Sequence, residues 1–245
     1  MEAEKIEAAS NMVSAELEEA RDAATRLRDN LPPRIEAAAL GVRSKAPFQL
    51  LCAREALIWR SEELARNACD ALEREDLSVA ALLTRALIEN AALVWKLWEI
   101  LDARHTHSPH ELNELLMRLL VGSRKWPDGP QAMQILSCID RMDKAVPGVR
   151  AGYDSLSEIA HPNWAGVAGL YSKPDPPRYL TEFGRGLRET KGTVDMIANA
   201  LLGSLGLFEL AYNRISDAMP AFLPELESLW PDEEVPNVAS VTANQ

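Results

Sequence analysis

LSVAALLTRALIENAALVWKLWEILDA, the stretch from Leu77 to Ala103, is apolar on most sides when it is wound as a helix. A helix that is apolar nearly all round lies in the middle of a bundle, where other helices cover it. The segments around it also place apolar residues three and four positions apart, and strand patterns are almost absent. We therefore predict an all-α fold, a multi-helix bundle built around this central helix.

Prolines and glycines divide the rest of the chain into further helical segments. Pro32-Pro33 ends the first helix, and Pro47 opens the helix that runs to Glu73. Ser108-Pro109-His110-Glu111 has the pattern of an N-cap, a first-turn proline and a capping-box glutamate. The predicted helices cover residues 2–30, 34–44, 47–73, 77–103, 109–121, 131–145, 150–161, 186–218 and 221–229. Between them, residues 162–184 are rich in proline and glycine, and they predict an irregular segment with one extended piece at 178–183.

The N-terminal helix is amphipathic and is predicted to extend from the bundle. Its apolar stripe follows helical spacing through Ile6, Val13, Leu17, Ala20, Ala24, Leu27 and Leu31. Such a stripe suits a partner helix and predicts dimerisation or docking; the alternative is that the helix folds back on its own bundle. The predicted organisation is a helical extension at 1–46, a bundle at 47–230 and a mobile tail at 231–245.

Composition narrows the class of protein. The chain has 245 residues, of which 47% are hydrophobic, so it can build a core. Its net charge of −11 disfavours broad non-specific binding to DNA or RNA. Cys52, Cys69 and Cys138 form no CxxC pair and are expected to be reduced. The acidic N-terminus does not resemble a secretory signal, and the longest apolar run, at 199–210, is too short to span a bilayer. We therefore expect a cytoplasmic protein that does not enter a membrane.

A second stretch, YDSLSEIAHPNW at residues 153–164, concentrates polar and aromatic side chains. Helical spacing places Tyr153, Ser157, Ala160 and His161 along one face, and Pro162 discourages the helix from continuing. A histidine at a helix C-terminus lies at the negative end of the helix dipole, which favours its charged form. This pattern indicates a polar site at a helix end.

Arg85 and Glu89 lie four positions apart on the central apolar helix, where unpaired charges are rare. One interpretation is an intrahelical ion pair on the single polar edge of that helix. The other is a pocket in which Arg85 meets the polar stretch at 153–164. We predict such a pocket, with His161 and Arg85 as the candidate catalytic pair and with these further binding residues: Glu89, Tyr153, Ser157, Glu158, Asn163 and Trp164. No cofactor is predicted.

Three histidines lie close together after the central helix, at His105, His107 and His110. Imidazole groups bind zinc or nickel, which makes a metal site one interpretation of this run. The sequence shows no second cluster of ligands, and the run coincides with a loop and a helix cap. No metal site is therefore predicted.

The chain resembles the HEPN superfamily, compact helical bundles found in prokaryotic toxins, defence proteins and partners of nucleotidyltransferases. The resemblance rests on RALIE at 85–89 and on YDSLSEIAHPN at 153–163, and it covers residues 48–215. Active members are metal-independent ribonucleases that use an arginine, a polar residue and a histidine at a dimer interface, the arginine and histidine being separated by a short interval. His161 has no arginine at that interval, whereas Arg104 and His110 fit it.

These observations leave three functions open. The first is a cytoplasmic bundle that binds a ligand or a protein partner in its polar pocket and forms a homo-oligomer through helical faces. The second is a metal-independent ribonuclease of a toxin or defence system, which acts on RNA through Arg85 and His161 or through Arg104 and His110. The third is a structural module whose N-terminal helix drives oligomerisation.

Overall fold

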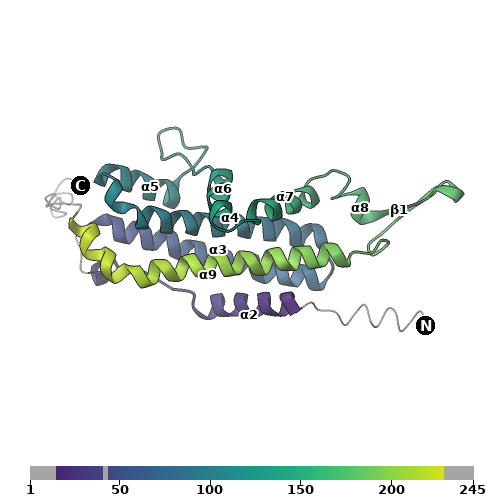
Figure 1. Ribbon diagram of the computed structural model, residues 1–245, viewed down its shortest axis with the longest axis horizontal. Coiled ribbons are helices and arrows are strands. Elements are labelled where there is room, and N and C mark those ends of the chain that lie inside the picture. The colour runs from purple at the N-terminus through teal and green to yellow at the C-terminus, as the bar shows by residue number, and fades with distance from the viewer. Residues whose placement is uncertain (1–14, 41–43, 229–245) are drawn as a thin grey trace, which may run out of the picture.

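Three long helices run along the length of the molecule (Figure 1). The computed structural model describes residues 15–40 and 44–228. The long helices are α3 (Lys45–Glu73), α4 (Leu77–Asp102) and α9 (Lys191–Ser228). The prediction of an all-α, multi-helix bundle is confirmed.

The central helix is α4, because it contacts α3, α9, α7 and α6. Its apolar residues face several directions, and Leu87, Val94, Leu97 and Leu101 are all fully buried. This arrangement explains why the stretch at 77–103 is apolar on most sides. The helix orders the bundle by offering a buried contact to each surrounding helix.

The shorter helices flank this centre. α5 (Pro109–Val121) contacts α3 and α4, whereas α6 (Ile135–Ala145) and α7 (Val149–Ala160) contact α4. The predicted capping box begins α5: the Ser108 hydroxyl accepts from the Glu111 N–H, and the Glu111 carboxylate accepts from the Ser108 N–H at 2.8 Å. Local spacing therefore fixed this helix start correctly.

The described part of the N-terminal helix, α2 (Ala15–Asp29), packs against α3 and α9 of the same chain. Its buried residues are Leu17, Ala20, Ala23, Ala24 and Leu27. These residues include the stripe that we predicted for a partner helix, so over residues 15–29 the helix folds back on its own bundle. Ile6 and Val13 lie outside the described residues. A homo-oligomer stays a prediction, and the buried part of this stripe is not available to form it.

The separate helix predicted at 221–229 is wrong, because α9 continues without a break to Ser228 and contains Pro220 and Pro224. A proline removes one helical hydrogen bond. Here Met219, Phe222 and Leu226 continue the buried stripe of α9 beyond the first proline, so packing against the core keeps the chain helical. The helix predicted at 34–44 is reduced to a short 3₁₀ turn, η1 (Ala37–Leu40), although 41–43 are not described.

Residues 168–183 form an arm that projects past the end of the bundle (Figure 1). The arm consists of α8 (Ala168–Tyr171), β1 (Ser172–Asp175), η3 (Pro176–Arg178) and β2 (Leu180–Phe183). The two strands are antiparallel and pair Ser172 with Phe183 and Asp175 with Leu180. The extended piece predicted at 178–183 overlaps β2, but β1 and α8 were not predicted, since proline and glycine obscure their pattern.

Among the described helices, α4 and α9 are long and apolar enough to cross a membrane by length and composition alone. We did not predict this, because isolated charges such as Arg85 and Glu209 interrupt the continuous apolar runs. Buried residues make up 56% of the relevant window of α4 and 39% of that of α9. A core helix of a bundle meets the same criterion, so the criterion is weak evidence for a membrane span.

Candidate functional site

The polar residues of α4 and the start of the 153–164 stretch meet in one cluster. Arg85 Nη2 donates a hydrogen bond to the Tyr153 hydroxyl at 2.5 Å, and that hydroxyl donates to Glu89 Oε1 at 2.9 Å. The Arg85 guanidinium also lies 4.7 Å from the centre of the Tyr153 ring and 3.6 Å from the Glu89 carboxylate. Arg85 therefore pairs with Glu89 on its own helix and contacts the 153–164 stretch through Tyr153 of α7, whereas a binding pocket built on this contact stays a prediction.

The Tyr153 hydroxyl is the centre of this cluster. Burial raises the pKa of the Tyr153 hydroxyl, and the hydrogen bond to the Glu89 carboxylate raises it further. The hydroxyl thus stays protonated at neutral pH and is held as a donor. These hydrogen bonds make the cluster a pin that holds α7 against α4. They leave Arg85 Nε, which is buried, without a hydrogen-bond partner among the described residues.

The next residues of the stretch build the turn that follows α7. Ser157 Oγ donates to the Tyr153 carbonyl at 2.8 Å, within the helix. Asn163 Nδ2 donates to Glu158 Oε2 at 2.7 Å, and Asn163 Oδ1 accepts from the Gly166 N–H at 3.1 Å. Asn163 therefore ties the end of α7 to the returning chain, and these predicted binding residues are occupied by local structure.

His161 does not join Arg85, contrary to our prediction. Its side chain is exposed, and the ring makes no hydrogen bond or ion pair with any residue of the described chain. Tyr153 already occupies the position beside Arg85. His161 is eight residues further along, about 12 Å at the rise of an α-helix, and its backbone has turned to an extended conformation at the C-cap. Helical spacing predicts that Tyr153 and His161 lie on one face of α7. It does not predict which of the two lies beside Arg85 of α4.

Trp164 is the other exposed member of the stretch. Its side chain is 67% exposed, and the Arg188 guanidinium lies 5.7 Å from the centre of its ring. Arg188 is itself held by the carbonyl of Ser172, at the base of the arm, at 2.7 Å. Trp164 therefore lies at the base of the arm and does not line a pocket with Arg85.

The alternative pair, Arg104 and His110, is not brought together. Arg104 forms an ion pair with Glu225, stacks 4.0 Å from the ring centre of Phe222, and donates to the Leu101 carbonyl at 3.1 Å. His110 is exposed on α5, 3.5 Å from Glu114. Arg104 serves as a tie between α4 and the end of α9. Within the described ranges, no group of three or more histidine, cysteine, aspartate or glutamate residues is placed to hold a metal ion.

A second arginine–tyrosine–glutamate cluster escaped sequence inspection. The Tyr212 hydroxyl of α9 donates to Glu55 Oε2 of α3 at 2.5 Å, and the Arg54 guanidinium lies 4.4 Å from the Tyr212 ring centre. Arg54 also pairs with Glu55 and donates to Ser216 Oγ at 2.8 Å. An arginine next to a glutamate is a common pair on solvent-exposed helix faces, so the sequence alone does not single out Arg54 and Glu55. Their burial between α3 and α9 shows that they hold these two helices together.

The cysteines offer no activated nucleophile. Cys69 and Cys138 are buried, Cys52 is half-buried, and all three are free thiols, as predicted. Burial raises the pKa of Cys69 to about 11, and burial also raises the pKa of Cys52 and of Cys138. A thiol needs a lowered pKa to act as a nucleophile at neutral pH, so these residues are structural.

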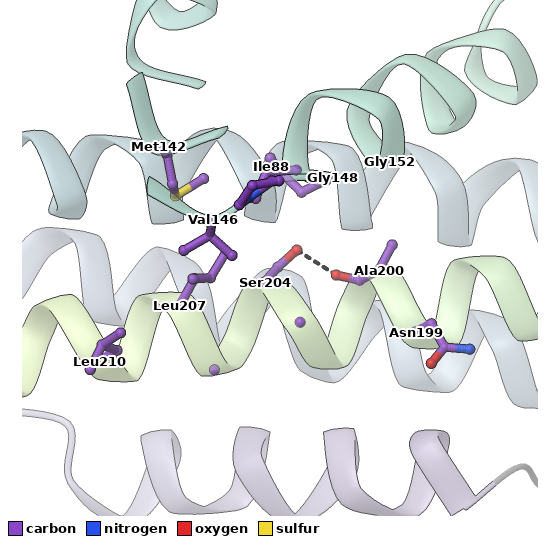
Figure 2. Close-up of a pocket in the computed structure, with 14 residues that line it drawn as sticks. Ile88, Met142, Val146, Gly148, Gly152, Asn199, Ala200, Ser204, Leu207 and Leu210 are labelled. Atoms are coloured by element: carbon purple, nitrogen blue, oxygen red, sulfur yellow. Dashed lines mark hydrogen bonds between the residues drawn. The ribbon is translucent and has the colours of Figure 1, made fainter. Parts of the chain in front are cut away.

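An apolar groove of about 470 Å³ lies between the α6–α7 corner and α9 (Figure 2). Ile88 of α4 lies between its two walls, which carry Val146 and Val149 on one side and Leu207 and Leu210 on the other. The Ser204 hydroxyl is turned back to the Ala200 carbonyl of its own helix, at 2.5 Å (Figure 2). The groove wall is consequently apolar even at this position.

This groove is not the predicted polar pocket, which stays a prediction. Arg85, Glu89 and Tyr153 do not line it, although their sequence neighbours Ile88 and Gly152 do. Adjacent residues of a helix point about 100° apart, so the polar pin and the groove lie on different sides of the contact between α4 and α7.

Four glycines line the groove, and sequence inspection did not select them: Gly148, Gly152, Gly203 and Gly206. A Cβ atom added at any of them would meet no neighbouring atom. Glycine inside a helix costs about 0.5–1 kcal/mol relative to alanine. Glycines inside otherwise apolar helical segments were the available signal for this groove.

Searches of protein-family models, of curated proteins and of solved structures returned no significant match.

Proposed function

We propose that this protein is a binding module that takes up apolar side chains of a polypeptide partner in the groove between the α6–α7 corner and α9. The observation that carries the proposal is the groove itself: it is open to solvent, it is lined by aliphatic side chains and glycines, and it measures about 470 Å³. Binding pockets of 300–1,000 Å³ with mainly apolar walls are the usual sites for ligands and for the anchoring side chains of partners.

The lining of the groove supports binding without catalysis. Its polar side chains are Asn199 and Ser204, and none of its lining residues is titratable in the neutral range. General acid–base chemistry needs a group that gains or loses a proton near neutral pH. Desolvation of apolar side chains is therefore the interaction that this surface offers.

The polar pin has a supporting role in this proposal. Arg85, Glu89 and Tyr153 fix α7 on α4, and α7 carries Val149 and Gly152 of the groove wall. A wall that is held in one position loses less conformational freedom when a partner binds.

The proposal is tested with the fluorescent apolar probe anilinonaphthalene sulfonate. The native protein, diluted until it sediments as a monomer, is expected to bind the probe, and Gly203→Leu is expected to weaken this binding at least about tenfold, because the new side chain occupies the groove. Leucine forms helices better than glycine, so the variant should remain folded.

The matched control is Gly192→Leu, which makes the same exchange on α9 outside the groove, where an added Cβ also meets open space. It should leave probe binding unchanged. Because partly folded proteins also bind this probe, each variant must keep a cooperative unfolding transition. Equal probe binding by wild type and Gly203→Leu would contradict the proposal.

A further inference from the structure

The arm exposes side chains that a protein ordinarily covers. Tyr179 is 98% exposed and Phe183 is 80% exposed, and every residue of β2 is exposed. A two-stranded hairpin is only marginally stable in water unless something packs against it, and β1–β2 makes extensive contacts only with itself and with α8. The arm therefore lacks, within one copy of the chain, the surface that would stabilise it.

Tyr179 adds a backbone cost to this exposure. It follows η3 with φ 51° and ψ 40°, the left-handed conformation that glycine or asparagine adopts more easily. A β-turn tip needs no aromatic side chain for its own geometry. Within the described part of a single chain, no contact of the Tyr179 side chain offsets the cost of its backbone conformation and of its exposure. This indicates that Tyr179 contacts another molecule.

The groove of the same copy is not within reach of the arm. The arm projects beyond the bundle at the end where α9 begins (Figure 1). The groove begins at Asn199, eight residues into α9, which is about 12 Å back along that helix. An arm that points away from its own groove leaves that groove open to a second molecule.

We infer that the arm of one copy of this chain docks into the groove of a second copy, and that the exchange is reciprocal. This inference rests on the function proposed above and names its partner. The Tyr179 and Phe183 rings enter between the α6–α7 corner and α9, where the glycines allow a close approach. One two-fold axis lets both arms and both grooves be filled at once, so the assembly closes as a dimer.

Charge does not oppose a second copy as the occupant. The chain carries a net charge of −11, so two bundle surfaces repel each other when they approach. The charges of the arm balance: Lys173 lies opposite Glu182 in the strand register, and Arg178 forms an ion pair with Asp175 at 2.5 Å. The groove has no charged lining residue. The arm and the groove are therefore surfaces through which two acidic copies can meet without bringing like charges together.

Sedimentation of the full chain over a wide range of concentration tests this assembly. Wild type is expected to form a dimer. Tyr179→Asn should weaken dimerisation about thirtyfold or more, as for a central aromatic anchor, while leaving the stability of the monomer equal or higher because asparagine tolerates the left-handed conformation. Gly203→Leu should weaken dimerisation equally. Trp126→Ser, which removes an exposed aromatic residue from the loop between α5 and α6, is the control and should not change it.

Mixing the two variants gives the decisive measurement. Tyr179→Asn retains an intact groove and Gly203→Leu retains an intact arm, so together they can form one of the two contacts. We expect a weak one-to-one complex in the mixture and none in either variant alone. Dimers that respond to Tyr179→Asn but not to Gly203→Leu would show that arms pair with each other, which overturns the inference.

A wild-type chain that stays monomeric at every concentration would also overturn it. In that case, probe binding that Gly203→Leu abolishes would still support the proposed function with a different polypeptide as the partner. If the chain stays monomeric and Gly203→Leu does not reduce probe binding, the groove is not a binding site.

Discussion

At the scale of single residues, the turn after α7 depends on the absence of a side chain at Gly166. A Cβ atom there would lie far inside van der Waals contact with the carbonyl oxygens of Ile159 and His161, which are backbone atoms and cannot move aside cheaply. We expect Gly166→Ala to lower the free energy of unfolding by about 1–3 kcal/mol. Gly152→Ala is the matched control: its Cβ meets open space within α7, and the change should raise stability by about 0.5–1 kcal/mol. Urea unfolding measures both, and equal effects would contradict this role of Gly166.

Tyr153 gives a pH-dependent prediction at the same scale. Its pKa is raised above the usual value of 10.0 by burial and by the Glu89 carboxylate. A raised pKa in the folded state means that the contribution of this hydroxyl is fully present below pH 10 and is lost as the pH rises through the folded-state pKa. We expect Tyr153→Phe to cost about 1–2 kcal/mol at neutral pH, because two hydrogen bonds to charged groups are lost.

The same substitution should also reduce the loss of stability in alkaline solution. Urea unfolding at neutral and alkaline pH checks both effects. Tyr179→Phe, on a fully exposed tyrosine, should change neither. A variant Tyr153→Phe as stable as wild type at all pH values would show that the pin contributes nothing.

At the scale of elements, α2 is an integral part of the bundle. Its buried face shares one core with α3 and α9, and Leu27 is 4% exposed. We expect Leu27→Ala to cost about 2 kcal/mol or more in the free energy of unfolding, because it removes a buried side chain and leaves a cavity. Glu18→Ala, on the exposed face of α2, should change stability by no more than about 0.5 kcal/mol. If Leu27→Ala instead left the free energy of unfolding unchanged and altered only the oligomeric state in solution, α2 would be a docking element.

At the scale of the whole molecule, we predict that the purified protein does not cleave RNA in the absence of metal. A phosphodiesterase site must manage protons and stabilise charge on a phosphate group with side chains that converge. His161 is exposed and is separated along α7 from the Arg85 pin, Arg104 is tied to Glu225, and the net charge of −11 does not gather RNA.

The assay compares wild type with His161→Ala and Arg85→Ala, with folding followed by circular dichroism. The exposed position of His161 predicts an unchanged melting temperature for His161→Ala. Cleavage by wild type that disappears in both folded variants would establish the ribonuclease alternative.

Local sequence determined most of the helices of this protein, whereas packing decided that α9 continues through Pro220 and Pro224. The apolar character of residues 77–103 predicted the central position of α4, and Ser108 and Glu111 predicted the start of α5. Both follow from interactions between residues a few positions apart, which helical spacing makes visible. Asn163 and Glu158, five positions apart, form an equally local contact. The sequence pointed to both as candidate binding residues and did not predict that they bond to each other.

Tertiary structure alone decided which of these residues meet. Tyr153 reaches Arg85 and His161 does not, because the height and rotation of α7 against α4 are set by the packing of several helices at once. The same packing turned the stripe of α2 inward and opened the groove beside α7. A helical pattern gives the face on which a residue lies, but the neighbour of that face is a property of the whole bundle, and so the candidate site had to be found in three dimensions.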